Sequence, residues 1–170
     1  KRAVPMMFDE IRRSMKNFRV NFDVWFHENS LYSDGEVDKA IADLRARGDI
    51  FEKDGATWFA STKHGDDKDR VLIKQNGELT YFMSDVAYHY DKKQRGYDLL
   101  IDIWGADHHG YIPRCQAMMA AWGYPNDLEV VLGQLVNLYR DGAAVRMSKR
   151  TGEMITFREL IDEVGVDATR

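Results

Sequence analysis

The sequence predicts an α/β fold with a parallel sheet and a hairpin-rich insertion, and three observations support this prediction. First, two apolar runs, 99–104 and 128–132, are each followed by a glycine. Second, the apolar residues of segment 113–122, between these runs, recur at helical spacing. A strand, a helix and a strand in this order form a βαβ unit with parallel strands. Third, the turn pairs Asp54-Gly55 and Asn76-Gly77 indicate hairpins before this unit.

Residues 1–27 are expected to form a helix followed by a strand. From Met7 to Phe18 the apolar residues fall at helical spacing, with basic residues on the opposite side. In segment 20–26 every second residue is apolar, which is the pattern of a half-buried strand. We expect this strand to end by Glu28.

Residues 28–80 are expected to form the hairpin-rich insertion. Ser33 and Glu36 match a capping box at the start of a helix that ends near Gly48. Asp-Gly and Asn-Gly pairs suit tight turns because the turn residues need positive φ. They predict two hairpins, over 50–59 and 71–82. The charged segment 63–69 between the hairpins is expected to be a solvated connection.

Residues 81–170 are expected to hold the parallel sheet and its helices. A helix is expected after Ser84, ahead of the βαβ unit. A last hairpin is expected to turn at Asp141-Gly142. Thr156 and Glu159 match a second capping box, which starts a final helix that ends at a glycine.

The composition limits the class of protein. Of the 170 residues, 44% are hydrophobic and 31% are charged, with a formal net charge of −4. The chain can therefore bury a core, and any contact with nucleic acid must come from a local basic cluster. The single cysteine, Cys115, excludes an internal disulfide and a zinc site of several thiolates. No apolar run approaches the roughly 20 residues that span a bilayer. These features predict a cytoplasmic protein.

The ends of the chain suggest a larger protein. The sequence starts with Lys1 and stops at Arg170, directly after the last capped helix. We therefore expect the chain to be a fragment of a longer one.

Two segments lie where a parallel sheet places its ligands, beyond the carboxyl ends of its strands. The first is Gly105-Ala106-Asp107-His108-His109-Gly110. Glycine allows a ligand close to the backbone, and a carboxylate can accept hydrogen bonds from a ribose diol. The alternative is a glycine turn in which Asp107 caps the next helix. A metal site with His89 as third ligand is disfavoured, because neighbouring side chains on a helix diverge by about 100°.

The second segment is Arg146-Met147-Ser148-Lys149-Arg150-Thr151-Gly152, which follows the last predicted hairpin. Three cations and two hydroxyls can close over a polyphosphate and neutralise charge that develops during displacement at phosphorus. The alternative is a solvated surface loop.

These two segments carry a resemblance. Arg146 to Arg150 resembles the Lys-Met-Ser-Lys-Ser signature of class I aminoacyl-tRNA synthetases, and Gly105 to His108 resembles their ribose-binding Gly-x-Asp segment. Further segments resemble the arginyl-tRNA synthetases of the bacterial type, namely 22–28, 65–70, 84–89 and 150–153. The similarity covers nearly the whole chain.

The resemblance implies a Rossmann-like fold, of which this chain would be the second half of the catalytic domain with its insertion. It implies a ligase that joins arginine to ATP, bound with Mg²⁺, as arginyl-adenylate, and then transfers arginine to its tRNA. It further implies a cytoplasmic enzyme that is a monomer at full length and holds no tightly bound metal. The family's His-x-Gly-His signature does not occur in these 170 residues. We therefore expect the chain to be inactive alone.

The resemblance also implies roles for single residues. Lys149 matches the lysine that stabilises pyrophosphate in the transition state, and Ser148 would hold the loop against ATP. Arg146 replaces the first lysine of the signature, so the charge is kept with a different donor geometry. The other implied contacts are to ATP from Met147, to its ribose from Gly105, Asp107 and His108, to adenine from Leu135 and Val136, and to arginine from Tyr81 and Asp85.

Two of these roles have simple alternatives. Asp85 can grip a guanidinium through paired hydrogen bonds, but it can also be an ordinary acid favoured by the dipole at a helix start. Leu135 and Val136 follow a strand, where an apolar pair is often plain core.

Two other functions stay open from the residues alone. A nucleotidyltransferase of the same superfold would also use a ribose aspartate and a basic loop. Residues 33–60, a helix followed by a hairpin, resemble part of a winged helix, which is a nucleic-acid-binding module. The acidic residues of that helix would repel phosphate.

Overall fold

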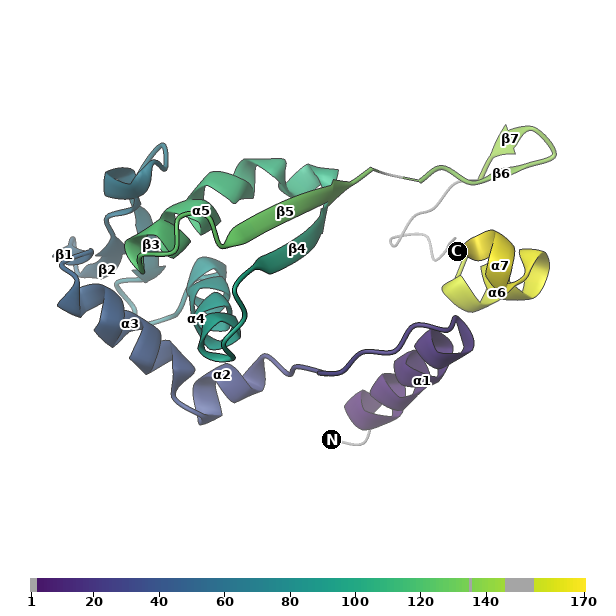
Figure 1. The fold of residues 1–170 in the computed structure, drawn as a ribbon, viewed down its shortest axis with the longest axis horizontal. Helices are drawn as coiled ribbons and strands as arrows, with labels where there is room; N and C mark the ends of the chain where they lie inside the picture. The colour runs from purple at the N-terminus through teal and green to yellow at the C-terminus, as the bar shows by residue number, and fades with distance from the viewer. Residues whose placement is uncertain (1–2, 135, 146–154) are drawn as a thin grey trace. The chain divides into compact units, whose positions relative to one another are not determined.

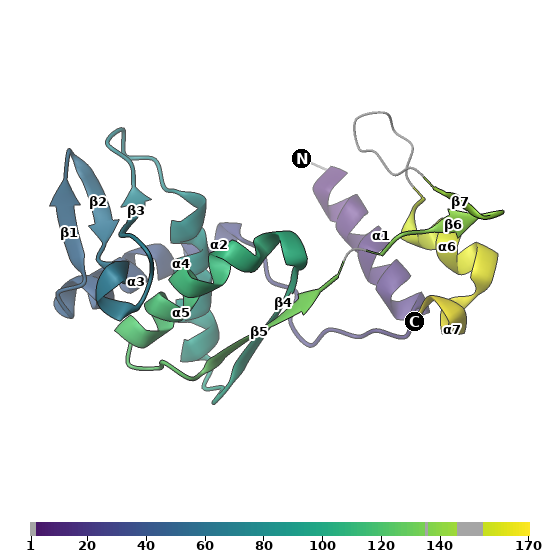
Figure 2. The ribbon, with the colours of Figure 1, turned by 90° about the horizontal axis from the view of Figure 1, so that it is seen from above.

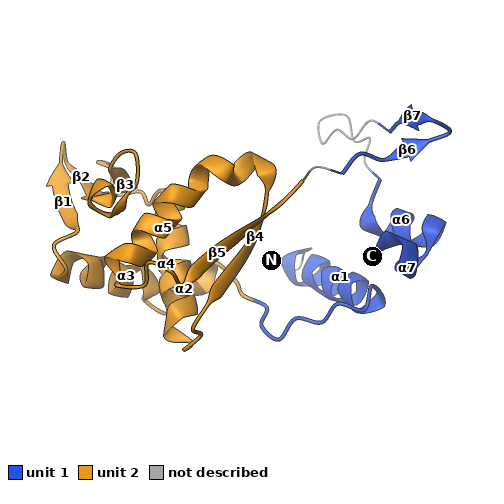
Figure 3. Cartoon of the chain, turned by 45° about the horizontal axis from the view of Figure 1, so that its top comes forward, with its two compact units in different colours: residues 1–25, 136–170 blue, residues 26–135 orange. Residues whose placement is uncertain are grey.

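The computed structural model describes residues 3–134, 136–145 and 155–170 (Figure 1). The chain forms two compact units (Figure 3). The larger unit comprises residues 26–135, and the smaller one combines residues 1–25 with 136–170. In the described part of the chain, no helix has the length and apolar character needed to cross a membrane.

The larger unit begins with two helices and an antiparallel sheet. Its elements are α2 (Asn29–Ser33), α3 (Glu36–Ala46), β1 (Ile50–Lys53), β2 (Ala56–Phe59), the 3-10 helix η1 (Ser61–His64) and β3 (Arg70–Ile73). The strands lie in the order β1-β2-β3. Asp54 and Gly55 join β1 to β2 with φ angles of 53° and 73°. The hairpin predicted over 50–59 is confirmed, with the positive φ angles that its turn requires.

The predicted βαβ unit is also confirmed. Its elements are β4 (Leu100–Gly105), the 3-10 helix η2 (Ala106–Tyr111), α5 (Ile112–Ala121) and β5 (Leu128–Gly133), preceded by α4 (Tyr81–Gln94). The strands pair in parallel from Leu100 opposite Leu128 to Gly105 opposite Gly133. Figure 2 shows the two strands side by side, with α4 and α5 next to them. The α/β class with a parallel sheet is therefore as predicted.

Burial alternates along both parallel strands. On β4 the side chains of Leu100, Asp102 and Trp104 are buried or half-buried, whereas Ile101 and Ile103 are exposed. The two-stranded sheet thus has one covered face and one open apolar face. The core on the covered side joins the antiparallel sheet, the four helices α2 to α5 and both parallel strands, with members that include Leu31, Leu44, Phe59, Leu72, Met83, Val86, Leu100, Met118 and Leu128.

The smaller unit brings together the two ends of the chain. It contains α1 (Ala3–Asn17), the hairpin of β6 (Tyr139–Arg140) and β7 (Ala143–Ala144), α6 (Phe157–Val164) and α7 (Val166–Thr169). The rings of Phe18 and Phe157 meet edge to face at 4.5 Å. Arg158 pairs with Glu10 at 2.7 Å, and Arg19 pairs with Asp167 at 2.8 Å.

Two predictions for the smaller unit are confirmed. Asp141 and Gly142 have φ angles of 50° and 78° at the turn between β6 and β7. Thr156 and Glu159 form a reciprocal capping box, in which each side chain accepts a hydrogen bond from the other residue's backbone N–H.

The strand predicted over 20–26 is wrong. Among the described residues no strand pairs with this segment, and Phe22 and Val24 are exposed. Trp25 instead meets Phe22 at 5.0 Å and Phe8 of α1 at 5.2 Å, and Phe26 stacks on Tyr88 of α4 at 4.4 Å. The alternating pattern therefore does not correspond to a strand in a sheet of the described structure.

The capping box predicted at Ser33 and Glu36 is also wrong. Ser33 ends α2 and donates to the carboxylate of Asp34 at 2.8 Å. The residue before α3 is Gly35, with a φ angle of 73°, and Glu36 pairs with Lys39 at 2.6 Å. The predicted apolar face of the helix is nevertheless buried. The left-handed turn at Gly35 separates the two helices and leaves Ser33 unable to cap the second one.

The hairpin predicted over 71–82 is reduced to a single bridge between Ile73 and Leu79. Tyr81 already begins α4, because Thr80 caps that helix by accepting a hydrogen bond from the Met83 backbone N–H at 3.3 Å. The helix cap at Thr80 therefore ends the hairpin two residues before its predicted end at residue 82.

The charged segment 63–69 is not simply a solvated connection. The carboxylate of Asp66 is buried and accepts hydrogen bonds from Ser61 at 3.0 Å and from Arg70 at 2.7 Å. Burial acts to raise the pKa of Asp66, but hydrogen bonds from Arg70, the Asp67 backbone and Ser61 lower it to about 2. The segment is therefore held to β3 by a buried ion pair.

Candidate active site

A cavity of about 820 Å³ lies in the larger unit, along β4 and around the carboxyl end of that strand. Residues of α4, β4 and η2 line it. The titratable side chains of the lining are those of Tyr81, Asp85, Tyr88, His89, Lys92, Asp102, His108 and Tyr111. A crevice at the carboxyl end of a parallel strand is where α/β sheets bind their ligands.

Tyr81 and Asp85 lie together on one wall of this cavity. They are four residues apart in α4, so their side chains project from the same face of the helix. Tyr81 is 92% exposed and Asp85 is half-buried. Asp85 falls in the second turn of α4, and a helix dipole acts mainly on the first turn. The dipole alternative therefore does not explain its position.

The carboxylate of Asp85 has a distinctive electrostatic setting. Burial raises its pKa above the usual range, against a hydrogen bond from the Tyr111 hydroxyl and the nearby charge of His89. Among the described residues no Lys, Arg or His side chain forms an ion pair with it. A cationic group that enters the cavity can therefore form an ion pair with Asp85, which forms none with a described residue.

A second carboxylate, Asp102, is already paired. Its Oδ2 lies 2.7 Å from Nε2 of His89, and its Oδ1 lies 2.5 Å from Nζ of Lys92. Burial acts to raise the pKa of Asp102, but the hydrogen bond and charge of His89, followed by those of Lys92, lower it to about 2. Both of its oxygens thus have hydrogen-bond partners within the protein.

The sequence analysis missed Asp102, Lys92 and Tyr111 and considered His89 only as a metal ligand. One signal was present for Asp102. It alternates with Leu100 and Trp104 along an apolar strand, which places an acid on the covered face of the sheet. A buried acid requires a partner, and His89 and Lys92 lie one turn apart on the preceding helix.

The segment after β4 forms the end of the cavity. Gly105 and His108 line it. A Cβ at position 105 would lie 2.6 Å from Oδ1 of Asp107, so a side chain there would displace that carboxylate from its present position. Asp107 does not cap α5, whose preceding residue, Tyr111, makes no side-chain cap. The capping alternative for Asp107 is therefore wrong.

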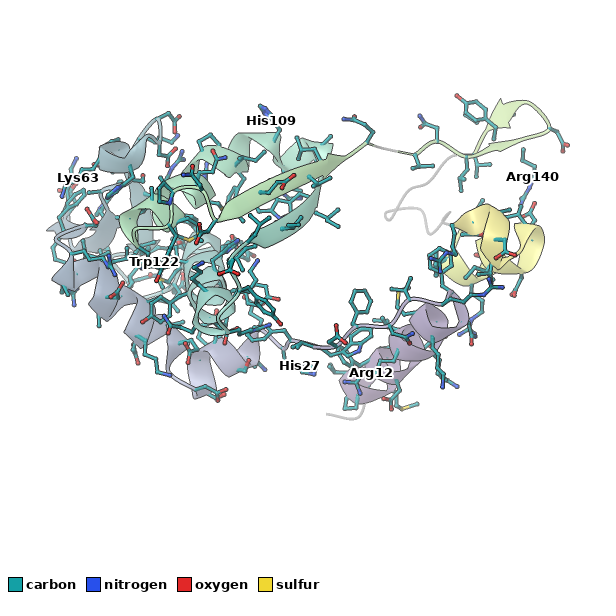
Figure 4. All side chains as sticks on the ribbon, viewed as in Figure 1. Arg12, His27, Lys63, His109, Trp122 and Arg140 are labelled. Carbon is teal, nitrogen blue, oxygen red and sulfur yellow. The ribbon has the colours of Figure 1, made fainter. Side chains whose placement is uncertain are left out.

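The adjacent histidines do not gather around a common site. His108 lies 3.8 Å from Asp107, and both side chains are exposed. His109, labelled in Figure 4, is exposed on η2 and does not line the cavity. No cluster of three or more His, Cys, Asp or Glu suited to a metal ion occurs in the part of the chain that the structure describes.

Of the remaining predicted residues, the structure describes Val136 alone. Arg146, Met147, Ser148, Lys149 and Leu135 lie outside the described residues. Val136 belongs to the smaller unit and is 74% exposed.

The chain is similar to known proteins along its whole length. Residues 1–170 match the family described as class I tRNA synthetases (R), catalytic domain. An arginine–tRNA ligase of Bifidobacterium adolescentis is 66% identical over 100% of this chain and 29% of its own length. The enzyme of the same name from Anoxybacillus flavithermus is 60% identical over 95% of this chain and 29% of its own length.

Solved structures have the same fold. A crystal structure of a Campylobacter jejuni protein assigned as an arginyl-tRNA synthetase has a TM-score of 0.88 at 38% identity, over 97% of this chain and 36% of that one. The arginyl-tRNA synthetase of Thermus thermophilus has a TM-score of 0.72 at 18% identity, over 89% of this chain and 31% of that one. The second similarity supports the fold alone.

The parallel sheet, the cavity at its carboxyl end and these matches define a class I aminoacyl-tRNA synthetase catalytic domain. Within that class, the chain belongs to the family of the arginine enzymes, the class I tRNA synthetases (R). It spans about 29% of the length of the curated relatives that it matches.

Proposed function

We propose that the protein containing this chain is an arginine–tRNA ligase. The observation that carries the proposal is the pair of Tyr81 and Asp85 on the cavity wall, where Asp85 is half-buried and makes no ion pair with a described residue. The 66% identity to an arginine–tRNA ligase supports the same activity.

The arginine substrate would bind through its guanidinium group. This group presents N–H donors in a planar fork that matches the two oxygens of a carboxylate, here those of Asp85. Tyr81 would lie beside the side chain of the substrate. A lysine substrate lacks the fork and would lose one of the paired hydrogen bonds.

ATP, bound with Mg²⁺, would occupy the end of the cavity and the basic loop. Gly105, Asp107 and His108 would hold the ribose, and Leu135 with Val136 would contact adenine. Arg146, Met147, Ser148 and Lys149 would cover the phosphates. These roles are proposals supported by the motifs and, for the ribose residues, by the position of Gly105 and His108 on the cavity.

The reaction would proceed in two displacements. A carboxylate oxygen of arginine attacks the α-phosphorus of ATP, and the bond to the leaving pyrophosphate breaks as the arginyl-adenylate forms. Lys149 would offset the charge that develops on pyrophosphate. A hydroxyl of the terminal ribose of the tRNA then attacks the arginyl carbonyl carbon, and AMP leaves.

The proposal extends to the setting of the enzyme. We place the full-length protein in the cytoplasm as a monomer, with arginine, ATP and arginine tRNA as its substrates. The single cysteine, which is buried, fits a reducing compartment.

The test is amino-acid-dependent exchange of pyrophosphate into ATP by the full-length protein, with cognate tRNA present. We expect exchange with arginine alone among the standard amino acids. Lys149→Ala should lower the exchange rate by about 100-fold or more, because a donor to the developing charge is lost. Turnover of a small phosphorylated substrate without any exchange would indicate a nucleotidyltransferase and contradict the proposal.

A further inference from the structure

His89 is buried beside the cavity and meets an acceptor at each ring nitrogen. Nδ1 lies 2.8 Å from the main-chain oxygen of Asp85, one turn earlier on α4. Nε2 lies 2.7 Å from a carboxylate oxygen of Asp102 on β4. A carbonyl and an ionised carboxylate only accept hydrogen bonds, and a neutral imidazole donates only one. Both contacts form together only when His89 carries a proton on each nitrogen.

Asp102, which accepts from Nε2 of His89, is ionised at neutral pH. The pKa of Asp102 lies at about 2, and its second oxygen accepts a hydrogen bond from Lys92 at 2.5 Å. With a proton on each ring nitrogen of His89, the cluster of His89, Lys92 and Asp102 contains two cations and one anion. Its excess positive charge lies on the same helix as Asp85.

This charge bears directly on Asp85. Burial raises the pKa of Asp85, and the negative charges of Asp102 and Glu28 raise it further, whereas the charge of His89 lowers it. The ionisable groups that surround Asp85 and His89 come from several elements, namely Glu28 ahead of α2, Lys92 on α4, Asp102 on β4, Tyr111 in η2, and Arg114 with Cys115 on α5.

We propose that His89 is a positioning residue for the guanidinium site, which it serves by holding the Asp85 backbone to β4 and by supplying a positive charge that keeps the Asp85 carboxylate ionised. The inference rests on the proposed function, because it takes Asp85 as the group that binds arginine. It requires no contact between His89 and the substrate. The imidazolium acts through Asp85 alone.

The test compares neutral replacements of His89 in the full-length protein. His89→Asn places an amide near Nδ1 and can keep the contact to the Asp85 carbonyl, and His89→Gln places one near Nε2 and can keep the contact to Asp102. Neither carries a charge. His109→Gln, at an exposed histidine outside the cavity, is the matched control. Steady-state charging of tRNA is measured against arginine and against ATP over a range of pH.

We expect the KM for arginine to rise about tenfold in both variants, with kcat and the KM for ATP within about twofold of wild type. Arginine binds ionised Asp85, so kcat/KM for arginine falls as the pH falls through the pKa of that carboxyl. Loss of the positive charge of His89 raises the pKa of Asp85. The acidic limb of the profile of kcat/KM against pH should therefore move to higher pH in the variants. A purely structural role for His89 does not move that limb.

The inference and the proposed function are contradicted by different results. A folded variant whose arginine KM and acidic limb match those of wild type and His109→Gln overturns the inference alone. If neither variant folds, as judged by its thermal unfolding midpoint, His89 serves the fold and the positioning role is wrong. A folded wild-type protein that charges no tRNA with arginine overturns the proposed function and this inference with it.

Discussion

At the scale of single residues, Gly105 controls the shape of one end of the cavity. Its missing side chain leaves room for the carboxylate of Asp107, which would otherwise lie 2.6 Å from a Cβ. Gly133 is its neighbour at the end of β5, and a Cβ there would meet only the Trp104 carbonyl at 3.6 Å, an ordinary contact. A Cβ would therefore crowd a neighbouring carboxylate at position 105 but not at position 133.

Gly105→Ala should raise the KM for ATP by about five- to tenfold, because the new methyl group displaces the proposed ribose ligand Asp107. Gly133→Ala is the matched control and should stay within about twofold of wild type. The measurement is steady-state charging of tRNA by the full-length protein at saturating arginine. Equal effects of the two substitutions would contradict the proposed role of Asp107.

Single residues also show how far sequence reasoning extends into the site. Tyr81 and Asp85 are implied by the resemblance to the arginine enzymes, and their spacing of four places them on one helix face, which is a local property. The cluster around Asp102 could not be predicted in this way, because its partners lie on α4 and the acid on β4. Only the packing of that helix against that strand decides which acid has a partner.

At the scale of elements, predictions that rest on adjacent residues mostly succeeded, although the capping box at Ser33 and Glu36 did not form. The turns at Asp54-Gly55 and Asp141-Gly142 and the cap at Thr156 depend on a few adjacent residues, and all three are confirmed. The strand predicted over 20–26 failed because a strand needs a partner, which a pattern of alternating residues does not supply. The division into segments 1–27, 28–80 and 81–170 stays a prediction.

The buried ion pair between Asp66 and Arg70 should stabilise the loop between β2 and β3. Arg70→Met leaves the Asp66 carboxylate buried without its main partner, which costs about 3 kcal/mol. Arg47→Met, which removes a partly exposed pair with Asp43, should cost under about 1 kcal/mol. Thermal unfolding of the full-length protein measures both, and equal losses would contradict the buried role of Asp66.

The same pair predicts a pH dependence. The pKa of Asp66 is about 2 in the fold, below its value in an unfolded chain of about 3.9. Its contribution to stability is therefore complete above pH about 4 and is lost as the pH falls toward 2. The difference in unfolding midpoint between wild type and Arg70→Met should shrink over that range, and a difference that is constant with pH would be contrary to this assignment.

At the scale of the whole molecule, the chain holds one proposed substrate pocket and only part of the machinery of its family. The His-x-Gly-His signature is absent from its 170 residues. We expect the purified chain to show no arginine-dependent charging of tRNA, under conditions in which the full-length protein is active. Sustained charging by the chain alone would refute this prediction.

The smaller unit also has a consequence for folding on the ribosome. Its helix α1 is made before the larger unit, yet its partners α6 and α7 follow only after that unit, with Arg19 and Asp167 separated by 148 positions in the sequence. Contacts across such a separation form late. During synthesis, the larger unit can complete its core while the apolar side chains of α1 still await their partners. Helix α1 is thus made before the larger unit but gains its tertiary contacts after that unit.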